Sequence, residues 1–361
     1  MEKNERIALS VLDVEKKYTY DVDEVITSDD KMVQWGKNND IPTLYLNCYR
    51  NSASLKSIID GTVGYILGEV IQVNAAKWAE TVNRRGISMR QFIAHLAMSL
   101  LTYGGFAFQI IYNKLGSPVE LYPLDFRRCR TNESKTKVWY SKKGWTRYST
   151  KSECFDSFNP DKFDVNNPTQ IFWYGGDYCS SVYPFPPYYG AMADVLTEIE
   201  CSKYSLNSVA NGFAARYIIN FPQANNLTDE QKDGIETAIK NKFCGSETDA
   251  NFMLYWDESG TGNGIDVKKI ETDDAPEKFI AIKDNARANI FTSMRATPNL
   301  FGLPTASTGF NSQEYDSAMK LYERTVVSPY RDVIIEAISK VVGVENSVEI
   351  TPIIIDFNTA E

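Results

Sequence analysis

The sequence predicts an α+β protein with a sizeable hydrophobic core. Of its 361 residues, 43% are apolar and 24% are charged, a balance typical of chains that fold. Stretches with the apolar spacing of helices are separated by short runs rich in Val, Ile, Tyr and Phe, which end at turn residues. The length suits one large domain or two to three smaller ones.

The N-terminal part begins with an arm and continues with two helices. Residues 1–35 are polar and acidic, so we expect an extended, partly mobile arm. Residues 38–42, Asn-Asn-Asp-Ile-Pro, have the chemistry of a helix start, and helical apolar spacing then continues to Gly68. A second helix is expected to begin at Ser88, because a glutamine three residues later completes a capping box, and to end at the glycines 104–105.

Short strands and loops are expected from there to about residue 175. Residues 106–112 and 119–124 predict a hairpin, with the Gly-Ser-Pro sequence of residues 116–118 as its turn. The aromatic runs 138–140 and 171–174 also favour strands. This part of the chain alone therefore combines helices and strands.

Two long helices are predicted in the second half. The Pro-Phe-Pro-Pro sequence 184–187 breaks the chain, and helical spacing follows over roughly 189–213. Residues 217–221 favour a strand. A second long helix is expected to start after residues 273–274, both aspartate, and to run to Pro298.

A small lobe is predicted between these two helices, over about 221–272. It has a helix that opens at Thr228 and two strands, 252–256 and 265–270. The glycine-rich stretch 259–264 is interpreted as the turn that joins these strands in a hairpin.

The C-terminal part predicts a loop, a kinked helix and a strand. Residues 298–311 are rich in small and polar residues and favour a loop. The helix that starts near Asn311 must kink or restart at Pro329, because proline lacks a backbone donor and clashes with the preceding turn. Residues 348–357 favour a terminal strand.

No catalytic residue, cofactor or metal site is expected. The single histidine, His95, lies on a helix among apolar neighbours and favours a structural role. One histidine and no paired cysteines exclude most zinc sites, and they exclude Ser-His or Cys-His pairs unless His95 itself serves. The six cysteines contain no C-x-x-C pair and predict no disulfide scaffold. No G-x-x-x-x-G-K-[ST] phosphate loop occurs. Catalysis by carboxylates alone stays open.

Nothing in the sequence predicts export or membrane insertion. The N-terminus has no signal-peptide pattern, and no apolar run approaches the length of a transmembrane helix. We expect a protein kept in a reducing, soluble compartment. Its net charge is −9, whereas a protein that grips duplex DNA is normally basic. The sequence therefore predicts no tight DNA binding, although DNA could pass along the protein.

The order of elements and several local motifs resemble the portal proteins of tailed bacteriophages, in the compact long-tailed-phage branch. Coverage is nearly the whole chain, and the collinear order carries the resemblance more than any single motif. The matching segments are Trp-Gly-Lys-Asn-Asn-Asp-Ile-Pro at 35–42, the helix 54–68, Leu-Thr-Tyr-Gly-Gly-Phe-Ala at 101–107, residues 207–212, Leu-Phe-Gly-Leu-Pro at 300–304, Asn-Ser-Gln-Glu-Tyr at 311–315 and Val-Ser-Pro at 327–329.

The resemblance implies a division of the chain into named parts. These are a wing, 1–188; a stem helix, 189–220; a clip, 221–273; a returning stem helix, 274–297; a tunnel loop, 298–311; and a kinked wing or crown-side helix with a terminal strand, 312–361. Little chain remains after about residue 343, which implies that a large crown is absent.

The resemblance also implies a structural, non-enzymatic function. About twelve copies would form a head-to-tail ring at one capsid vertex, and double-stranded DNA would be packaged and ejected through it. Implied partners are other copies of the chain, the terminase large subunit, the head-tail adaptor, the major capsid or scaffolding protein, and DNA that passes non-specifically. No membrane partner is implied. The protein would be assembled in the bacterial host cytoplasm and kept in the virion. An acidic wall fits a channel, because every neutralised phosphate would add drag.

Three groups of residues are candidates for function. Possible DNA-channel cations are Lys278, Lys283, Arg287 and Arg295, for which the alternative is a solvated helix face with ordinary ion pairs. The tunnel loop would include Pro298, Asn299, Gly302, Pro304, Thr308 and Gly309, or be a plain helix connector. The clip tip, Trp256, Gly260, Gly262 and Gly264, would face the motor or adaptor, or be an ordinary surface loop. Other hypotheses for the whole chain are another phage head-tail assembly protein or a carboxylate-dependent enzyme.

Overall fold

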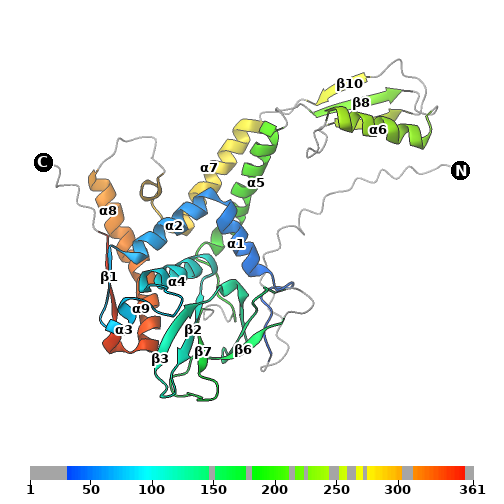
Figure 1. Ribbon diagram of the computed structural model, residues 1–361. Coiled ribbons are helices and arrows are strands. Elements are labelled where there is room, and N and C mark those ends of the chain that lie inside the picture. The colour runs from blue at the N-terminus through cyan, green and yellow to red at the C-terminus, as the bar shows by residue number, and fades with distance from the viewer. Residues whose placement is uncertain are drawn as a thin grey trace. The chain divides into compact units, whose positions relative to one another are not determined.

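The computed structural model describes residues 31–145, 151–175, 181–210, 216–222, 227–243, 252–257, 266–270, 275–302 and 312–353. The chain divides into two compact units (Figure 1). The first unit joins Met1–Met192 with Ile290–Glu361, and the second is Ala193–Asn289. Both ends of the chain thus belong to one unit, and the second unit is an insertion in it.

The first unit contains helices from both ends of the sequence. These are α1 (Ile41–Asn51), α2 (Ala53–Leu67), α3 (Ala76–Ala79), α4 (Met89–Tyr103), α8 (Ser312–Tyr322) and α9 (Ser328–Val342), with single 3-10 turns at Phe126–Arg128, Tyr189–Ala191, Pro298–Phe301 and Val344–Asn346. The predicted limits of α4 are confirmed. Ser88 and Gln91 form the capping box, and Gly104 ends the helix in the left-handed conformation at φ +80°.

A six-stranded sheet lies beside α4 in the first unit. Its strands are β2 (Phe106–Tyr112), β3 (Pro118–Pro123), β4 (Cys129–Thr131), β5 (Lys137–Tyr140), β6 (Glu153–Ser157) and β7 (Thr169–Tyr174), in the order β3-β2-β7-β6-β5-β4. Only the β6–β7 pair is parallel. Phe92 of α4 meets Phe108 edge-on at 5.3 Å between ring centroids, and Phe108 stacks on Phe172 of β7 at 4.9 Å. These buried rings form the interface between helix and sheet.

The predicted β2–β3 hairpin is confirmed. Its turn is held by Asn113, whose side-chain oxygen accepts from the backbone N–H groups of Leu115 and Ser117, both at 2.9 Å. Gly116 takes φ +79° there, a conformation that costs glycine little. The predicted terminal strand is β11 (Val348–Thr351), which pairs antiparallel with β1 (Val70–Val73), a strand the sequence reasoning missed.

The N-terminal segment of the described chain packs tightly against the sheet. The predicted arm extended to residue 35, yet Val33 and Trp35 are buried, and the Val33 N–H donates to the Thr131 carbonyl at 2.9 Å. Trp35 stacks on Tyr183 with 4.4 Å between centroids. Residues 1–30 lie outside the described part, so the arm prediction applies only there.

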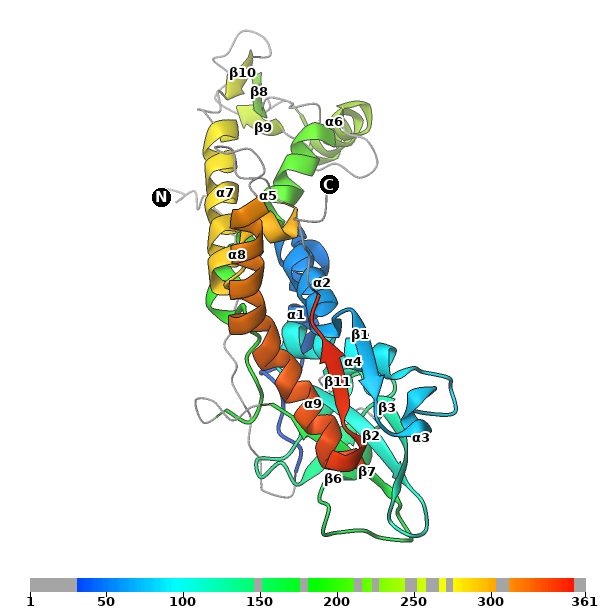
Figure 2. The same cartoon turned by 90° about the vertical axis from the view of Figure 1, so that its left-hand side faces the viewer.

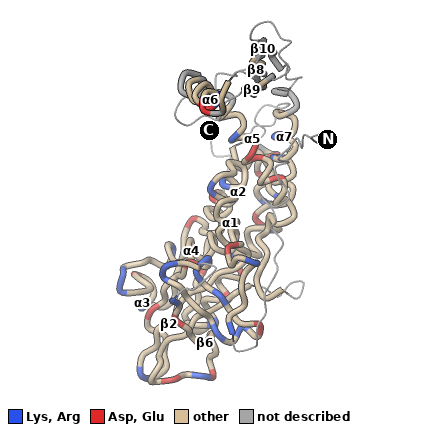
Figure 3. Tube along the Cα trace, turned by 90° about the vertical axis from the view of Figure 1, so that its right-hand side faces the viewer, with Lys and Arg blue, Asp and Glu red and all other residues tan. Residues whose placement is uncertain are grey.

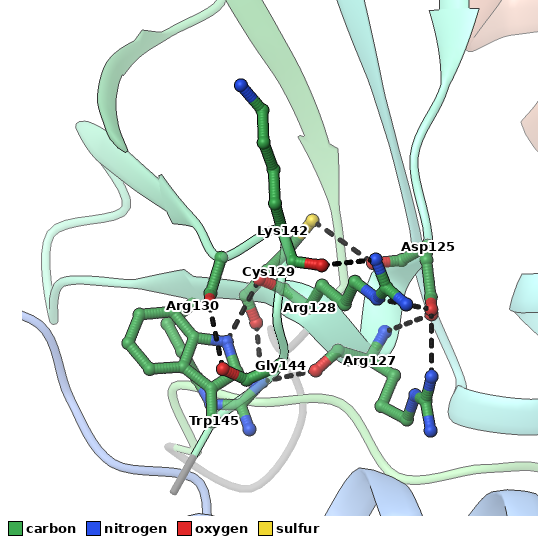
Figure 4. A network of polar contacts seen from close by, with 9 residues as sticks. Asp125, Arg127, Arg128, Cys129, Arg130, Lys142, Gly144 and Trp145 are labelled. Carbon is green, nitrogen blue, oxygen red and sulfur yellow. Dashed lines mark hydrogen bonds and ion pairs between the residues drawn. The ribbon is translucent and has the colours of Figure 1, made fainter. Parts of the chain in front are cut away.

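A buried arginine fastens this segment to the sheet. The Arg130 guanidinium lies between the rings of Trp35 and Trp145, at 5.6 and 5.3 Å from their centroids. It donates to the Asn39 side-chain and backbone oxygens and to the carbonyls of Arg127 and Cys129. Burial lowers the pKa of Arg130 but leaves it charged at neutral pH. Figure 4 shows the part of this network on the sheet side, with Arg127, Cys129 and Trp145 near Arg130.

The predicted kink at Pro329 is also confirmed. A π-helical segment, Glu323–Val327, separates α8 from α9, and Pro329 occupies the first turn of α9, where its missing N–H costs nothing. In Figure 2 the two helices follow each other down one side of the first unit, with β11 returning beside α9.

The second unit holds two long helices and a small α/β lobe. Its elements are α5 (Met192–Ala210), α6 (Asp229–Phe243), α7 (Ala275–Ser293), β8 (Arg216–Pro222), β9 (Phe252–Asp257) and β10 (Asp266–Ile270). The last residues of α7, from Ile290 onwards, belong to the first unit. The strand order is β10-β8-β9, with β8 parallel to β9 and antiparallel to β10.

The predicted hairpin in this lobe is therefore wrong. β9 and β10 do not pair with each other, because β8 lies between them. The strand at 217–221 was placed outside the lobe, although it is the central strand of the lobe's sheet. Local turn chemistry misled the prediction, since a glycine-rich connection can cross over a strand as well as close a hairpin.

Candidate functional site

The helices α5 and α7 form an antiparallel pair within the second unit (Figures 1 and 2). Near one end, the Asn289 side-chain amide donates to Asp194 at 2.9 Å. Ten residues further along each helix, Tyr204 stacks on Phe279 with 4.3 Å between centroids. The equal spacing shows that the two helices stay in contact in register over this length.

Two of the four candidate channel cations lie together on α7. Lys283 and Arg287 are one turn apart on the same face and are both partly exposed. Arg287 pairs with Asp284 at 3.5 Å. Lys278 belongs to α7, but its side chain lies outside what the structure describes. Figure 3 shows basic and acidic residues interspersed along the described Cα trace.

The fourth candidate, Arg295, lies beyond the end of α7 and belongs to the first unit. It adopts φ +52°, which is uncommon for a residue with a Cβ. Its N–H donates to the Thr292 carbonyl at 3.0 Å, and the Ala296 N–H donates to the Phe291 carbonyl at 2.9 Å. This is a Schellman motif with arginine at the position that glycine usually occupies.

The start of the predicted tunnel loop is an ordered turn. Pro298 and Asn299 begin the 3-10 segment Pro298–Phe301, and Gly302 ends it with φ +79°. Asn299 is exposed. The other candidates in this loop, Pro304, Thr308 and Gly309, lie outside the described residues.

Phe301 anchors this turn to the first unit through an aromatic cluster. Its ring meets Tyr322 of α8 at 5.5 Å, Tyr65 of α2 at 6.1 Å and Phe291 of α7 at 6.3 Å. A Cβ added to Gly61 of α2 would lie 2.7 Å from the Phe301 ring, so this packing requires glycine there. The sequence reasoning missed the cluster, although aromatic residues at apolar helix positions were the available signal.

Hydrogen bonds reinforce the anchor. Ser57 donates to the Phe301 carbonyl at 3.2 Å, and Tyr65 donates to the Leu300 carbonyl at 3.3 Å. The Thr62 and Tyr322 hydroxyl oxygens are 2.6 Å apart. Burial raises the pKa of Tyr322 to about 12. The described end of the loop is thus fixed, whatever the rest of the loop does.

The candidate clip-tip residues are only partly described. Trp256 lies in β9, partly exposed, and stacks on Phe221 of β8 with 4.8 Å between centroids. Gly260, Gly262 and Gly264 lie outside the described residues. In the sheet, β8 lies between β9 and β10, so these two strands do not form the predicted hairpin.

Other sites expected or excluded from the sequence can now be placed. His95 is exposed on α4, and its predicted structural role stays a prediction. Cys48, Cys129, Cys154 and Cys201 are free thiols. Among the described residues no group of three or more His, Cys, Asp or Glu could hold a metal. Nor does any helix of this part combine the length and apolarity needed to cross a bilayer.

One cavity of about 400 Å³ lies in the first unit, near the start of α9. Leu100, Tyr174, Phe185 and Tyr330 contribute to its lining, which contains no charged residue. Such a lining would suit an apolar side chain better than a charged ligand.

Solved structures show where the fold has been seen before. A chain in the virion of a native gene transfer agent particle is 16% identical, with a TM-score of 0.59, over 92% of this chain and 88% of that one. A chain in the neck of the native particle, computed with C12 symmetry, is 16% identical with a TM-score of 0.53, over 94% and 87%. An HK97-family portal protein from Corynebacterium diphtheriae is 12% identical with a TM-score of 0.49, over 82% and 88%.

The sequence itself matches a family model. The model is that of the phage portal protein, and the match covers residues 79–360, most of the chain. No curated protein is similar enough in sequence to count as a relative. The matched range contains the six-stranded sheet, both long helices, Phe301 with its neighbours Phe291 and Tyr322, and the helices α8 and α9 on either side of the π-helical segment. The chain belongs to the phage portal protein family.

Proposed function

We propose that copies of this portal subunit form a closed ring at one capsid vertex, through which double-stranded DNA is packaged and later ejected. The family match over residues 79–360 carries the proposal. The similarity of fold to a chain from a C12-symmetric neck supports a ring of about twelve copies. The role is structural, without catalysis, and the place of action is the virion after assembly in the host cytoplasm.

The proposed parts of the subunit follow the chain. The first unit supplies a wing, and its C-terminal helices lie on the wing or crown side. In the second unit, α5 and α7 are stem helices, and the lobe with β8, β9 and β10 is a clip. The lobe would dock the terminase large subunit during packaging and the head-tail adaptor afterwards. The wing would contact the major capsid or scaffolding protein.

The segment 298–311 is proposed as a tunnel loop with a fixed base. Phe301 anchors its N-terminal end, as its contacts with Tyr65 and Tyr322 indicate. The acidic net charge of −9 supports transit without tight binding, because a wall with few cations does not hold phosphates.

Native mass spectrometry of the purified chain tests the ring. Closed rings of about twelve copies are expected. A strictly monomeric species at high protein concentration would refute the proposal.

A further inference from the structure

Among the described side chains of the α5–α7 pair, the two most exposed large apolar ones lie on different helices. Leu206 of α5 is 68% exposed, and Ile280 of α7 is 61% exposed. Around Leu206, the exposed residues Lys203, Ser205 and Asn207 are polar. The contacts described within the pair are those of Asp194 with Asn289 and of Tyr204 with Phe279. Leu206 and Ile280 take no part in these two contacts.

The directions of these two side chains follow from helix geometry. Along an α-helix the side-chain direction rotates by about 100° per residue about the helix axis. The direction of any side chain can therefore be given as an angle from the residues that touch the other helix. Leu206 lies about 160° from the mean direction of Asp194 and Tyr204, and therefore faces away from α7. Ile280 lies about 140° from the mean direction of Phe279 and Asn289, and therefore faces away from α5.

The two side chains also lie at nearly the same height along the pair. Tyr204 is level with Phe279, because their rings stack. Leu206 lies two residues beyond Tyr204, and Ile280 lies one residue from Phe279 in the opposite direction. The difference of three residues corresponds to roughly 4.5 Å, less than one helical turn.

We infer that Leu206 of one copy packs against Ile280 of the next copy and that this contact is the stem seam of the ring. The inference rests on the proposed ring function and names the surface that closes it. A head-to-tail ring needs two different surfaces on opposite sides of the subunit, whereas a two-fold dimer needs one surface that meets itself. A cyclic ring has no rise between copies, so contacting residues must lie at similar heights when the helices follow its axis. Leu206 and Ile280 satisfy both conditions.

A second exposed isoleucine on α7 provides a matched control. Ile282 is 48% exposed and only two residues from Ile280. Its direction lies about 20° from the mean of Phe279 and Asn289, on the side that faces α5 of the same copy. It should therefore not reach Leu206 of a neighbouring copy.

Cross-linking of the assembled full chain tests the seam. The background carries Cys154→Ser, Cys179→Ser and Cys244→Ser, because Cys154 is exposed and the other two lie outside the described residues. Rings of Leu206→Cys/Ile280→Cys are treated with a short bifunctional maleimide, which tolerates a wider spacing than a disulfide. Denaturing gels should show a ladder of linked chains up to the whole ring. Leu206→Cys/Ile282→Cys should give none.

Mixed rings test the head-to-tail geometry. When chains with only Leu206→Cys assemble with chains that have only Ile280→Cys, linked dimers should form and no larger product. Leu206→Cys alone should not link to itself. If it does, the contact is two-fold and the inference fails.

The remaining outcomes distinguish failure of the proposed seam from failure of the proposed ring. If rings form and mass spectrometry shows that both thiols have reacted, but no ladder appears, the seam is wrong and the ring proposal stands. If the parent chain forms no rings, the proposed function fails first.

A charge exchange provides a second test. Leu206→Glu and Ile280→Lys should each raise the concentration needed for assembly about tenfold or more, because each buries an unpaired charge. The double variant should recover most of this loss. The contact is refuted if the double variant needs as high a concentration for assembly as the single variants do, or a higher one.

Discussion

Arg331 and Glu323 form a buried ion pair that bridges the π-helical segment. One Arg331 amino group donates to Glu323 at 2.5 Å, and the rest of the guanidinium donates to the carbonyls of Tyr65 and Ile66 at 2.6 and 3.0 Å. These carbonyls belong to the last turn of α2, where backbone carbonyls lack the N–H donors that they would have inside a helix. The Tyr65 carbonyl also accepts from the Gly68 N–H at 3.2 Å. One side chain therefore caps α2 and holds the irregular segment that precedes Pro329.

Removal of this arginine should destabilise the fold strongly. Arg331→Met is expected to lower the free energy of unfolding by about 3 kcal/mol, because it leaves the partly buried Glu323 side chain without its partner and removes donors from two helix carbonyls. Urea unfolding measures the change. The control is Lys320→Gln, which removes an exposed ion pair with Asp316 and should cost under about 1 kcal/mol. Equal losses in both variants would contradict the capping role.

Two glycines of α2 should respond oppositely to alanine. Gly64→Ala should stabilise by about 0.5–1 kcal/mol, because a Cβ there meets nothing within 4 Å and alanine favours helix. Gly61→Ala should destabilise, because the same atom would meet the Phe301 ring at 2.7 Å. Unfolding midpoints give the signs, and limited proteolysis at 303–311 reports whether the loop base is released. A stabilising Gly61→Ala would show that Phe301 does not need this contact.

Elements with strong local chemistry were predictable from the sequence. The capping box at Ser88, the hairpin with Gly116 and the break at Pro329 each depend on a few adjacent residues, and all three are confirmed. Strand pairing in the lobe was not predictable, because nothing in β9 or β10 shows that β8, more than thirty residues before β9, lies between them. Local turn chemistry does not encode sheet order.

In the candidate site, too, local features were predictable from the sequence and tertiary contacts were not. The position of the loop base could be read from Pro298 and Gly302, whereas its anchor required tertiary contacts. Tyr65 and Tyr322 lie far apart in the sequence, and only the fold brings their rings to Phe301. The exposure of His95 also depends on the fold, since Phe92 and Leu96 of the same helix are buried.

Because Arg295 has a left-handed backbone conformation, a glycine at this position should give a more stable protein than an alanine, the reverse of the usual order in helices. Both Arg295→Gly and Arg295→Ala remove the side chain, but only alanine keeps the cost of a Cβ at φ +52°. The glycine variant should therefore be more stable than the alanine variant by about 1 kcal/mol, measured by urea unfolding. Greater stability of the alanine variant would mean that the helix end rearranges.

Tyr322 should make stability depend on alkaline pH. Burial raises its pKa from 10.0 to about 12, so the protonated hydroxyl stabilises the fold fully below pH 10, and this contribution is lost as the pH rises towards 12. Tyr322→Phe should be less stable than the parent chain by about 1 kcal/mol at pH 8, since the bond to Thr62 is lost. The difference should shrink above pH 10 and then reverse. Urea midpoints at pH 8, 9.5 and 11 test this, and a constant difference would contradict it.

Lys283 of α7 should affect DNA retention if its side chain faces the channel. It lies about 80° from the α5-facing direction of α7, nearly at right angles to the line that joins the two helices. In a ring whose neighbours meet through Leu206 and Ile280, that direction faces either the channel or the outside. Arg287 lies about 120° from the α5-facing direction, close to the side of Ile280, and is therefore left unchanged. Lys283→Gln should leave ring formation intact and change the amount of DNA retained in filled heads, measured after nuclease treatment. The matched control is Lys320→Gln on α8, and retention equal to that of the control would place Lys283 on the outer face.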